Sequence, residues 1–382
     1  MVSIIVNKSN NNDIHGAFNE STRNVPNNAK LVLFFASTIY HYPQLVQLFT
    51  AKFPSSQVVG LTTVGEINNE GIEENSLTVA AFSGNDVQAN TVFMERIHKY
   101  PVFQRQQLID AAKSVGIDTK RKSAKNNAVA LVFPNGLINA EERLLSIVNS
   151  VFDYEGFPIF GGTAGDDAKF KETFTSVNEQ FANDAGVVIF LKTNADMKIY
   201  KESIFEGYSD DVLIATKVDV EGRKVFEFNG RPAASEYARI LNVQPVQLDR
   251  LFMAHPLGFV GKKLSVGSPM CVNPDQSISF YCQISRNAEM KVLRPLDVVT
   301  TMDQTVAQLK RDFTSIEGVL AVNCILRKIQ FKETRMLPEV NKRFKQMPNV
   351  FGFCSYGEQL QNEQINQTLV LLAMGQMKGT RS

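Results

Sequence analysis

The feature that most constrains the fold is a set of short, uninterrupted apolar runs. Residues 30–36 read KLVLFFA and residues 127–133 read NAVALVF. Runs of this length are typical of strands that are buried on both faces. Stretches with apolar residues at helical spacing lie between the strand candidates, several of which follow one another directly. We therefore predict an α/β fold in which mixed β-sheets are flanked by helices.

The remaining elements follow from the same patterns. Strands are predicted at residues 57–61, 76–82, 87–94, 185–192, 197–201, 277–284, 319–329, 349–356 and 368–374. Helices are predicted at residues 41–53, 103–115, 140–152, 233–241, 306–313 and 339–346. We expect Asn139 to cap the helix at 140–152, with Glu142 completing a capping box.

The length of the chain predicts more than one domain. A chain of 382 residues is long enough for two or three cores. The strand pattern restarts near residues 219–228, so we predict an N-terminal domain of residues 1–223 and a C-terminal domain of residues 224–382. Residues 1–29 are rich in asparagine and are expected to be loose at the start, and no periodic repeat is detected.

Composition excludes some classes of partner. The net charge is +1, so no overall field attracts the chain to nucleic acid or to a membrane surface, and neither is expected as a partner. The basic run Lys120-Arg121-Lys122 is interpreted as a solvated loop.

Sequence also suggests the compartment. No apolar run approaches the roughly 18 residues that span a bilayer, and the N-terminal stretch does not resemble a signal peptide. The four cysteines form no C-x-x-C pair. We expect a cytoplasmic protein with buried, reduced thiols.

Residues 160–167, FGGTAGDD, combine three glycines with a threonine and two aspartates. Glycines this dense allow positive φ angles and close approach, and successive free N–H groups can cradle an anion. Gly161, Gly162, Thr163 and Asp166 are therefore candidate ligand-binding residues. The alternative is a tight turn with a capping aspartate. The stretch is neither a P-loop nor a G-x-G-x-x-G fingerprint.

Several ordered motifs make the chain resemble the FIST family of prokaryotic sensory proteins over roughly residues 30–375. They are GLTTVGEI at 60–67, GGTAGDD at 161–167, NGRPA at 229–233, HPLG at 255–258, CILR at 324–327 and YGE at 356–358. The chain departs from the family at Leu61, Thr62 and Val64, where the family usually has Cys, Ser and Ala. A role that depends on a cysteine there is excluded.

The resemblance implies detection of a small ligand rather than catalysis. It is closest to the stand-alone type, which signals through a separate protein, and a subgroup of that type binds haem, senses nitric oxide and regulates a histidine kinase of a two-component system. A haem-free sensor of an amino acid or similar metabolite is the alternative. An enzyme that uses Asp166 or Asp167 as a base is a third class, which we do not expect.

Haem iron needs an axial donor, and neutral imidazole is the commonest. Among the four histidines, His255 has the most apolar neighbours, so it is our candidate axial ligand. The alternative is a core histidine that is hydrogen-bonded to the main chain.

Three further residues are candidates for the ligand pocket, which we expect between the two domains. Arg327 interrupts an otherwise apolar predicted strand, where a guanidinium usually pairs with a carboxylate or an anionic ligand. Tyr356 and Glu358 could offer a hydroxyl and a carboxylate to a ligand amine. The alternatives are an outward-facing arginine and an ordinary turn.

Overall fold

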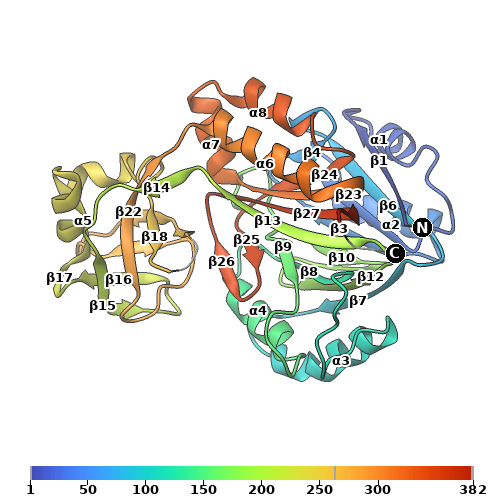
Figure 1. Cartoon of the computed structure of the whole chain (residues 1–382), viewed down its shortest axis with the longest axis horizontal. Helices are drawn as coiled ribbons and strands as arrows, with labels where there is room; N and C mark the ends of the chain where they lie inside the picture. Colours follow the sequence, from blue (N-terminus) through green and yellow to red (C-terminus); the bar gives the residue numbers. More distant parts are fainter. Residues whose placement is uncertain (1, 262–263, 380–382) are drawn as a thin grey trace.

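The computed structural model describes residues 2–261 and 264–379, and these form two parts (Figure 1). The larger part, the body, contains three six-stranded sheets. The smaller part, the lobe, spans residues 205–295 and contains a nine-stranded sheet with helix α5. Figure 1 shows the lobe on the left and both chain termini at the far end of the body.

The body consists of three units with the same order of elements. The first contains β1 (Ser3–Ser9), α1 (Ile14–Ser21), β2 (Leu31–Ala36), α2 (Tyr42–Lys52), β3 (Gln57–Thr62), β4 (Glu66–Asn68), β5 (Gly71–Glu73) and β6 (Leu77–Ser83). The second contains β7 (Gln88–Met94), α3 (Arg105–Ser114), β8 (Ala128–Pro134), α4 (Glu141–Asn149), β9 (Ile159–Gly162), β10 (Thr175–Val177), β11 (Gln180–Ala182) and β12 (Gly186–Lys192), with the 3₁₀-helix η1 (Pro101–Gln104) before α3. The third contains β13 (Asp196–Ser203), α6 (Val298–Asp312), β23 (Phe313–Cys324), α7 (Ile325–Glu333), β24 (Val350–Ser355), β25 (Glu358–Leu360), β26 (Glu363–Ile365) and β27 (Thr368–Met377), with α8 (Leu337–Phe344) after α7.

The three units exchange their hairpins in a cycle. Each sheet pairs β2 with β3, β8 with β9, or β23 with β24 in parallel, and all its other pairings are antiparallel. The hairpin β10–β11 of the second unit completes the first sheet, β25–β26 of the third completes the second, and β4–β5 of the first completes the third. The units share their pairing geometry and their apolar pattern, but few identical residues. No periodic repeat is therefore visible in the sequence.

Alternate residues of all three sheets point into one central core. Three rings, one from each unit, meet there. The centroid of Phe353 lies 4.9 Å from that of Phe35 and 5.9 Å from that of Phe133. The outer faces of the sheets are covered by α1 and α2, by α3 and α4, and by α6, α7 and α8. Mixed sheets flanked by helices are therefore confirmed.

The lobe is inserted into the third unit, between β13 and α6. Its elements are β14 (Phe205–Gly207), β15 (Leu213–Asp219), β16 (Lys224–Phe228), β17 (Arg231–Pro232), α5 (Ala233–Leu241), η2 (Pro245–Arg250), β18 (Leu257–Phe259), β19 (Ser265–Gly267), β20 (Pro269–Val272), β21 (Ile278–Phe280) and β22 (Glu289–Pro295). The predicted division between residues 223 and 224 falls in the β15–β16 turn of this lobe. This division of the chain into two domains stays a prediction. Two of the body's sheets contain strands from both sides of the predicted boundary.

A buried ion cluster, the Arg223 latch, ties the lobe to the body. Nη2 of Arg223, in the β15–β16 turn, lies 2.6 Å from carboxylate oxygens of both Glu141 and Glu142 at the start of α4. Its Nη1 donates to Asn139 Oδ1 (3.2 Å) and to the carbonyl oxygen of Tyr281 (3.0 Å). The predicted capping box is therefore wrong, because the side chains of Asn139 and Glu142 turn to the arginine and Ala140 takes the N-cap position.

Two other predictions differ from the structure. The sequence predicts that the start of the chain is loose, but within residues 2–29 it forms β1 and α1, and β1 pairs along its whole length with β6. The predicted strand at 319–329 ends at Cys324 and continues as α7. A short apolar run does not distinguish a strand from a buried helix, and Arg327 therefore lies on a helix.

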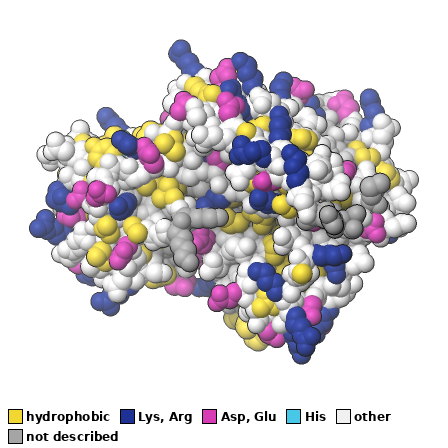
Figure 2. Space-filling view, in the orientation of Figure 1, with side chains coloured by type: hydrophobic (Ala, Val, Ile, Leu, Met, Phe, Trp, Pro, Cys, Tyr) yellow, Lys and Arg dark blue, Asp and Glu magenta, His cyan; other side chains and the backbone are white. Residues whose placement is uncertain are grey.

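On the face of the molecule shown in Figure 2, acidic and basic side chains are interspersed over the lobe and the body. Among the described residues, every helix is too short or too polar to cross a membrane.

The glycines at 162 and 165 are required by close packing. Neither has a φ angle in the left-handed region. A Cβ on Gly162 would meet the side chains of Val322 and Phe353, and one on Gly165 would meet Val64.

We expect Gly162→Val and Gly165→Val each to lower the free energy of unfolding by about 1–3 kcal/mol or more, because overpacking forces the core apart. Urea denaturation measures this. Gly207→Val is the control, since a Cβ there would meet only the Ser209 carbonyl oxygen at 3.9 Å. Wild-type stability of both core variants would contradict the packing argument.

Candidate functional site

The turns that follow β3, β9 and β24 meet at the centre of the body. We call residues 62–66, 162–166 and 354–358 the three-turn ring. Main-chain hydrogen bonds join each turn to the next, with Gly165 N donating to Thr62 O (2.9 Å), Val64 N to Cys354 O (3.1 Å) and Thr163 N to Gly357 O (2.9 Å). The glycine stretch of the sequence is thus one turn of a closed ring.

The N–H groups of this turn are engaged within the protein. Those of Thr163, Ala164 and Gly165 all donate to main-chain carbonyl oxygens. A cradle forms a few residues later, where the N–H groups of residues 170, 171 and 172 donate to the Asp166 carboxylate at 2.9, 2.6 and 3.0 Å. The anion in that cradle is the chain's own aspartate.

The first and third turns are built alike around a buried glutamate. Thr63 Oγ1 donates to Glu66 (2.5 Å), and Ser76 also donates to it. Ser355 Oγ donates to Glu358 (2.7 Å), and so does Thr368 Oγ1 (2.6 Å). Burial raises the pKa of Glu66 to about 8 and that of Glu358 to about 7, although the hydroxyl donors favour the charged forms. Both carboxyls therefore titrate near neutral pH.

The second turn breaks this pattern. Its acidic residue, Asp166, accepts from the hydroxyl of Tyr356 as well as from the cradle. Its hydroxyl residue, Thr163, accepts instead from Gln359 Nε2 at 2.7 Å. One turn of the ring therefore presents a different set of polar groups from the other two.

Tyr356 is held in place by both ends of its side chain. Its ring stacks on Phe170 at a centroid distance of 4.9 Å and an angle of 10°. Burial and the hydrogen bond to the Asp166 carboxylate raise the pKa of the Tyr356 hydroxyl, so it stays protonated and donates.

Three buried amides lie beside the altered turn, and we call Gln359, Gln364 and Asn366 the amide cluster. Gln359 Nε2 donates to Gln364 Oε1 at 2.5 Å, and the side chains of Gln364 and Asn366 crowd against Gly357. Asn366 and Gln359 are fully buried, and Gln364 is 6% exposed. Four of their atoms have no hydrogen-bond partner: Gln359 Oε1, Gln364 Nε2, Asn366 Oδ1 and Asn366 Nδ2. Buried polar atoms of this kind point to a missing partner.

The amide cluster lies at the seam between body and lobe. The lobe residue Ser268 donates to Gln367 Oε1 (2.7 Å), and Gln367 Nε2 donates to the carbonyl oxygen of Met253 (2.9 Å). The main-chain N–H of Asn366 donates to Val266 O at 3.1 Å. The lobe therefore contacts the chain segment that carries Asn366, beside the cluster.

Arg327 lies next to the ring on α7. Its Nη2 donates to Glu202 at 2.6 Å and its Nε to Asn323 at 3.0 Å, while Nη1 and Glu202 Oε2 have no hydrogen-bond partner. Its positive charge also favours the ionised form of Glu358. The expected carboxylate partner exists, and it comes from β13.

His255 lies in the lobe, just before β18, and is half-buried. Its Nδ1 lies 3.0 Å from the carbonyl oxygen of Leu293, and Tyr208 packs edge-on to its ring at 5.5 Å.

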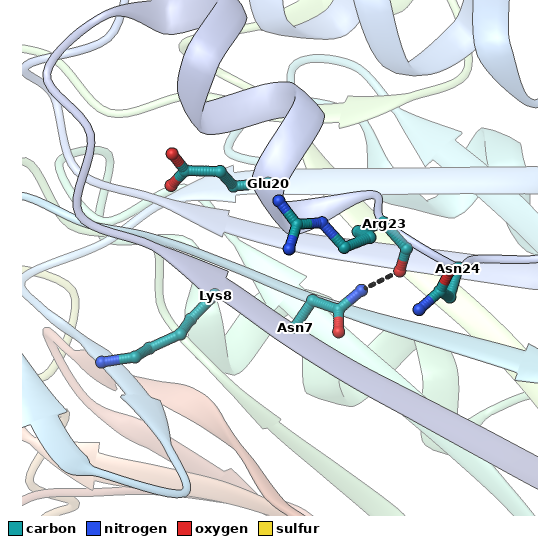
Figure 3. Close-up of a pocket in the computed structure, with 5 residues that line it drawn as sticks. All are labelled: Asn7, Lys8, Glu20, Arg23 and Asn24. Carbon is teal, nitrogen blue, oxygen red and sulfur yellow. Dashed lines mark hydrogen bonds between the residues drawn. The ribbon is translucent and has the colours of Figure 1, made fainter.

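A hollow of about 370 Å³ opens between β1 and the end of α1 (Figure 3). Two of its three charged side chains are already engaged: Lys8 pairs with Glu73 at 2.6 Å, and Glu20 accepts from Ser9 at 2.5 Å. Asn7 donates to the main chain of Arg23. This arrangement gives the hollow little capacity to hold a ligand.

The structure brings Gly162, Thr163, Asp166, Tyr356 and Glu358 together in the ring, with Gly161 opposite Gln359 in the adjoining strands. Sequence reasoning missed Glu66 and the amide cluster. Two signals point to them: the spacing of a hydroxyl residue and an acid in 63–66 and 355–358, and the amide-rich run at 359–367. In residues 2–261 and 264–379, no three His, Cys, Asp or Glu side chains converge as a metal site.

The two buried glutamates predict a pH dependence of stability. Their pKa values are raised in the folded state, so between about pH 4.5 and 8 the native protein binds more protons than the unfolded chain. Stability from these groups is therefore fully present at low pH and falls as pH rises through the folded pKa values. Glutamine cannot lose a proton, so the variants lack this pH-dependent loss. In urea titrations, the stability of Glu66→Gln and of Glu358→Gln relative to the wild type should therefore increase as the pH is raised from about 5 to about 9.

Glu289→Gln, on an exposed glutamate of β22, is the matched control and should track the wild type across the range. A Glu66→Gln variant whose stability relative to the wild type is constant with pH would show that this carboxyl is not protonated in the fold.

Comparison with known proteins agrees with the motifs of the chain. The chain is 22% identical over 383 residues to the uncharacterized protein MJ1623 of Methanocaldococcus jannaschii. The matched region covers 91% of this chain and 72% of that protein. The crystal structure of a cyanuric acid hydrolase from A. caulinodans aligns with 98% of this chain and 100% of its own at 7% identity, with a TM-score of 0.39. That TM-score is low, and the site described above does not depend on it.

Two family models match consecutive parts of the chain. A model described as FIST N domain matches residues 30–231, and one described as FIST C domain matches residues 233–361. The chain therefore belongs to the FIST family, whose domains serve small-ligand sensing in signal transduction.

Proposed function

We propose that this protein is a sensor of a small polar metabolite, such as an amino acid, which binds at the amide cluster beside the lobe. The observation that carries the proposal is the set of four buried, unpartnered polar atoms on Gln359, Gln364 and Asn366. Leaving a buried polar group without a partner costs about 1–3 kcal/mol. A ligand that offers both donors and acceptors would recover part of that free energy.

The position of the cluster suggests how binding would become a signal. Lobe residues lie beside the cluster, where the seam hydrogen bonds and the Arg223 latch hold the lobe to the body. A ligand with different affinities for the docked and displaced lobe shifts the balance between them. The lobe surface would then report the ligand to a separate partner.

The partner and compartment belong to the proposal as well. A histidine kinase is the class of partner that the stand-alone type of this family suggests. The four cysteines are free thiols, which suits the reducing cytoplasm. Membership of the family supports a sensory role, and we propose that the protein acts without catalysis.

A thermal-shift screen with amino acids and related metabolites tests the proposal. A ligand at about 100 times its Kd stabilises the protein by about 2.7 kcal/mol, which raises Tm measurably. Asn366→Leu should keep the Tm of the ligand-free protein, because the amide it removes has no partner, and should lose the shift.

Thr50→Val is the matched control, since Thr50 in α2 also has an unpartnered buried oxygen. It should keep the ligand-induced shift. A shift that persists in Asn366→Leu, or a wild type that no polar metabolite stabilises, would refute binding at the cluster.

Haem-based sensing of nitric oxide is the second candidate, and it rests on His255. The Nδ1 contact with the Leu293 carbonyl fits an axial ligand, because it leaves Nε2 for a metal. The surroundings of His255 fit haem less well. Neither the hollow between β1 and α1 nor the cavity beside the end of β12 borders this histidine. Bound haem would supply the nitric oxide ligation, and His255 would hold and orient it.

A visible spectrum of protein from haem-supplied cells distinguishes the haem-based sensor from the metabolite sensor. If haem binds, His255→Ala should abolish or shift the Soret band, and His15→Ala, on an exposed histidine of α1, should not. A wild-type protein without a Soret band would exclude haem sensing and leave metabolite sensing as the remaining candidate. A folded His255→Ala variant with an unchanged Soret band would exclude His255 as the axial ligand.

A further inference from the structure

A second cavity, of about 320 Å³, is lined by residues other than those of the amide cluster. It opens between the α3–β8 loop and the α4–β9 loop, beside the end of β12. Its volume falls at the lower end of the range for small-molecule sites, roughly 300–1,000 Å³. The basic run expected to be a solvated loop lies at its rim.

The cavity is strongly basic. Arg121, Lys122, Lys125 and Lys192 line it, and Asp118 is the single acidic residue among its lining residues. Within the described part of the chain, none of the four cations forms a salt bridge. Lys192 Nζ donates to the Gly116 carbonyl oxygen, and the other three cations are exposed, so the hollow carries positive charge that attracts anions.

Asp118 does not neutralise the cavity, because its carboxylate serves its own loop. It accepts from the main-chain N–H of Lys120 at 2.8 Å and of Arg121 at 3.2 Å, and these bonds lower its pKa. The hydroxyl of Tyr154 donates to the Asp118 carbonyl oxygen at 3.2 Å. The loop that carries the cations is thus fixed before any ligand arrives.

The floor of the cavity is apolar and partly aromatic. Ile117 and Phe157 are buried, and Tyr154 and Pro158 are half-buried beside them. Gly156 leaves space at the rim, where an added Cβ would lie 3.3 Å from Lys122 Nζ. A flat, uncharged group can lie on this floor while a charged group faces the cations.

We propose that this cavity binds a small molecule that joins a phosphate to a flat ring, as a nucleoside monophosphate does. Arg121 offers paired N–H donors that match phosphate oxygens, and the lysines add point charges. The half-buried ring of Tyr154 supplies the surface for the ligand ring. The site is separate from the amide cluster, so it stands or falls independently of the sensor proposed above.

Isothermal titration of the full chain with AMP, pyrophosphate and adenosine tests the proposal. AMP should bind more tightly than pyrophosphate, which lacks the ring, and than adenosine, which lacks the phosphate. AMP binding should weaken as salt is raised, because screening reduces charge attraction. Equal affinity for AMP and pyrophosphate would overturn the nucleotide assignment, and an absence of AMP binding would overturn the site.

Charge-matched variants locate the site. Arg121→Ala/Lys125→Ala removes two exposed cations of the cavity and should weaken AMP binding about tenfold or more. Lys310→Ala/Arg311→Ala removes two exposed cations of α6 and should leave it unchanged. Equal weakening in both double variants would mean general charge attraction and would overturn the proposal. Since all four side chains are exposed, both proteins should retain the wild-type Tm.

Discussion

The cyclic exchange of hairpins is the constraint on which the rest of the structure depends. Each sheet of the body lacks two strands until a neighbouring unit supplies β4–β5, β10–β11 or β25–β26. The chain leading into each hairpin passes through the three-turn ring, so closing the sheets also closes the ring. Pairing of residues that are 196 positions apart, such as Thr163 and Gln359, is a direct result. No unit can complete its hydrogen bonds alone.

The ring explains how the protein keeps acidic groups in its interior. Glu66 and Glu358 are fully buried, yet each accepts from two hydroxyl groups of residues in or next to the neighbouring strands. Such a group is tolerated only when its partners are fixed, because burial disfavours the charged form. The second turn departs from this arrangement, and the unpartnered amides lie next to it. The break in the internal symmetry therefore marks the candidate site.

The lobe differs from the three units in how it is attached. It is an insertion between β13 and α6, so two chain segments connect it to the body. Beyond these, it is held by polar contacts along the seam, by the Arg223 latch, and by Phe205, Val266 and Leu293, which pack in one apolar cluster with residues of the body. Removing one partner of a buried ion pair costs about 3–5 kcal/mol, whereas separating the pair into water allows both groups to be solvated. The polar part of this attachment is thus suited to a part that changes position, while the apolar part opposes the movement.

The sequence by itself determined the local elements of this protein. Uninterrupted apolar runs specified β2 and β8, the pattern at residues 233–241 specified α5, and their alternation specified mixed sheets flanked by helices. It also predicted Thr163, Asp166, Tyr356 and Glu358 as candidate ligand-binding residues, because glycine-rich turns with polar residues are locally visible. Only the tertiary structure decided that α7 carries Arg327 to Glu202, that the hairpins change sheets, and that three amides meet beside the lobe. These features depend on strand pairing between distant segments, and no local pattern of residues encodes which strands will meet.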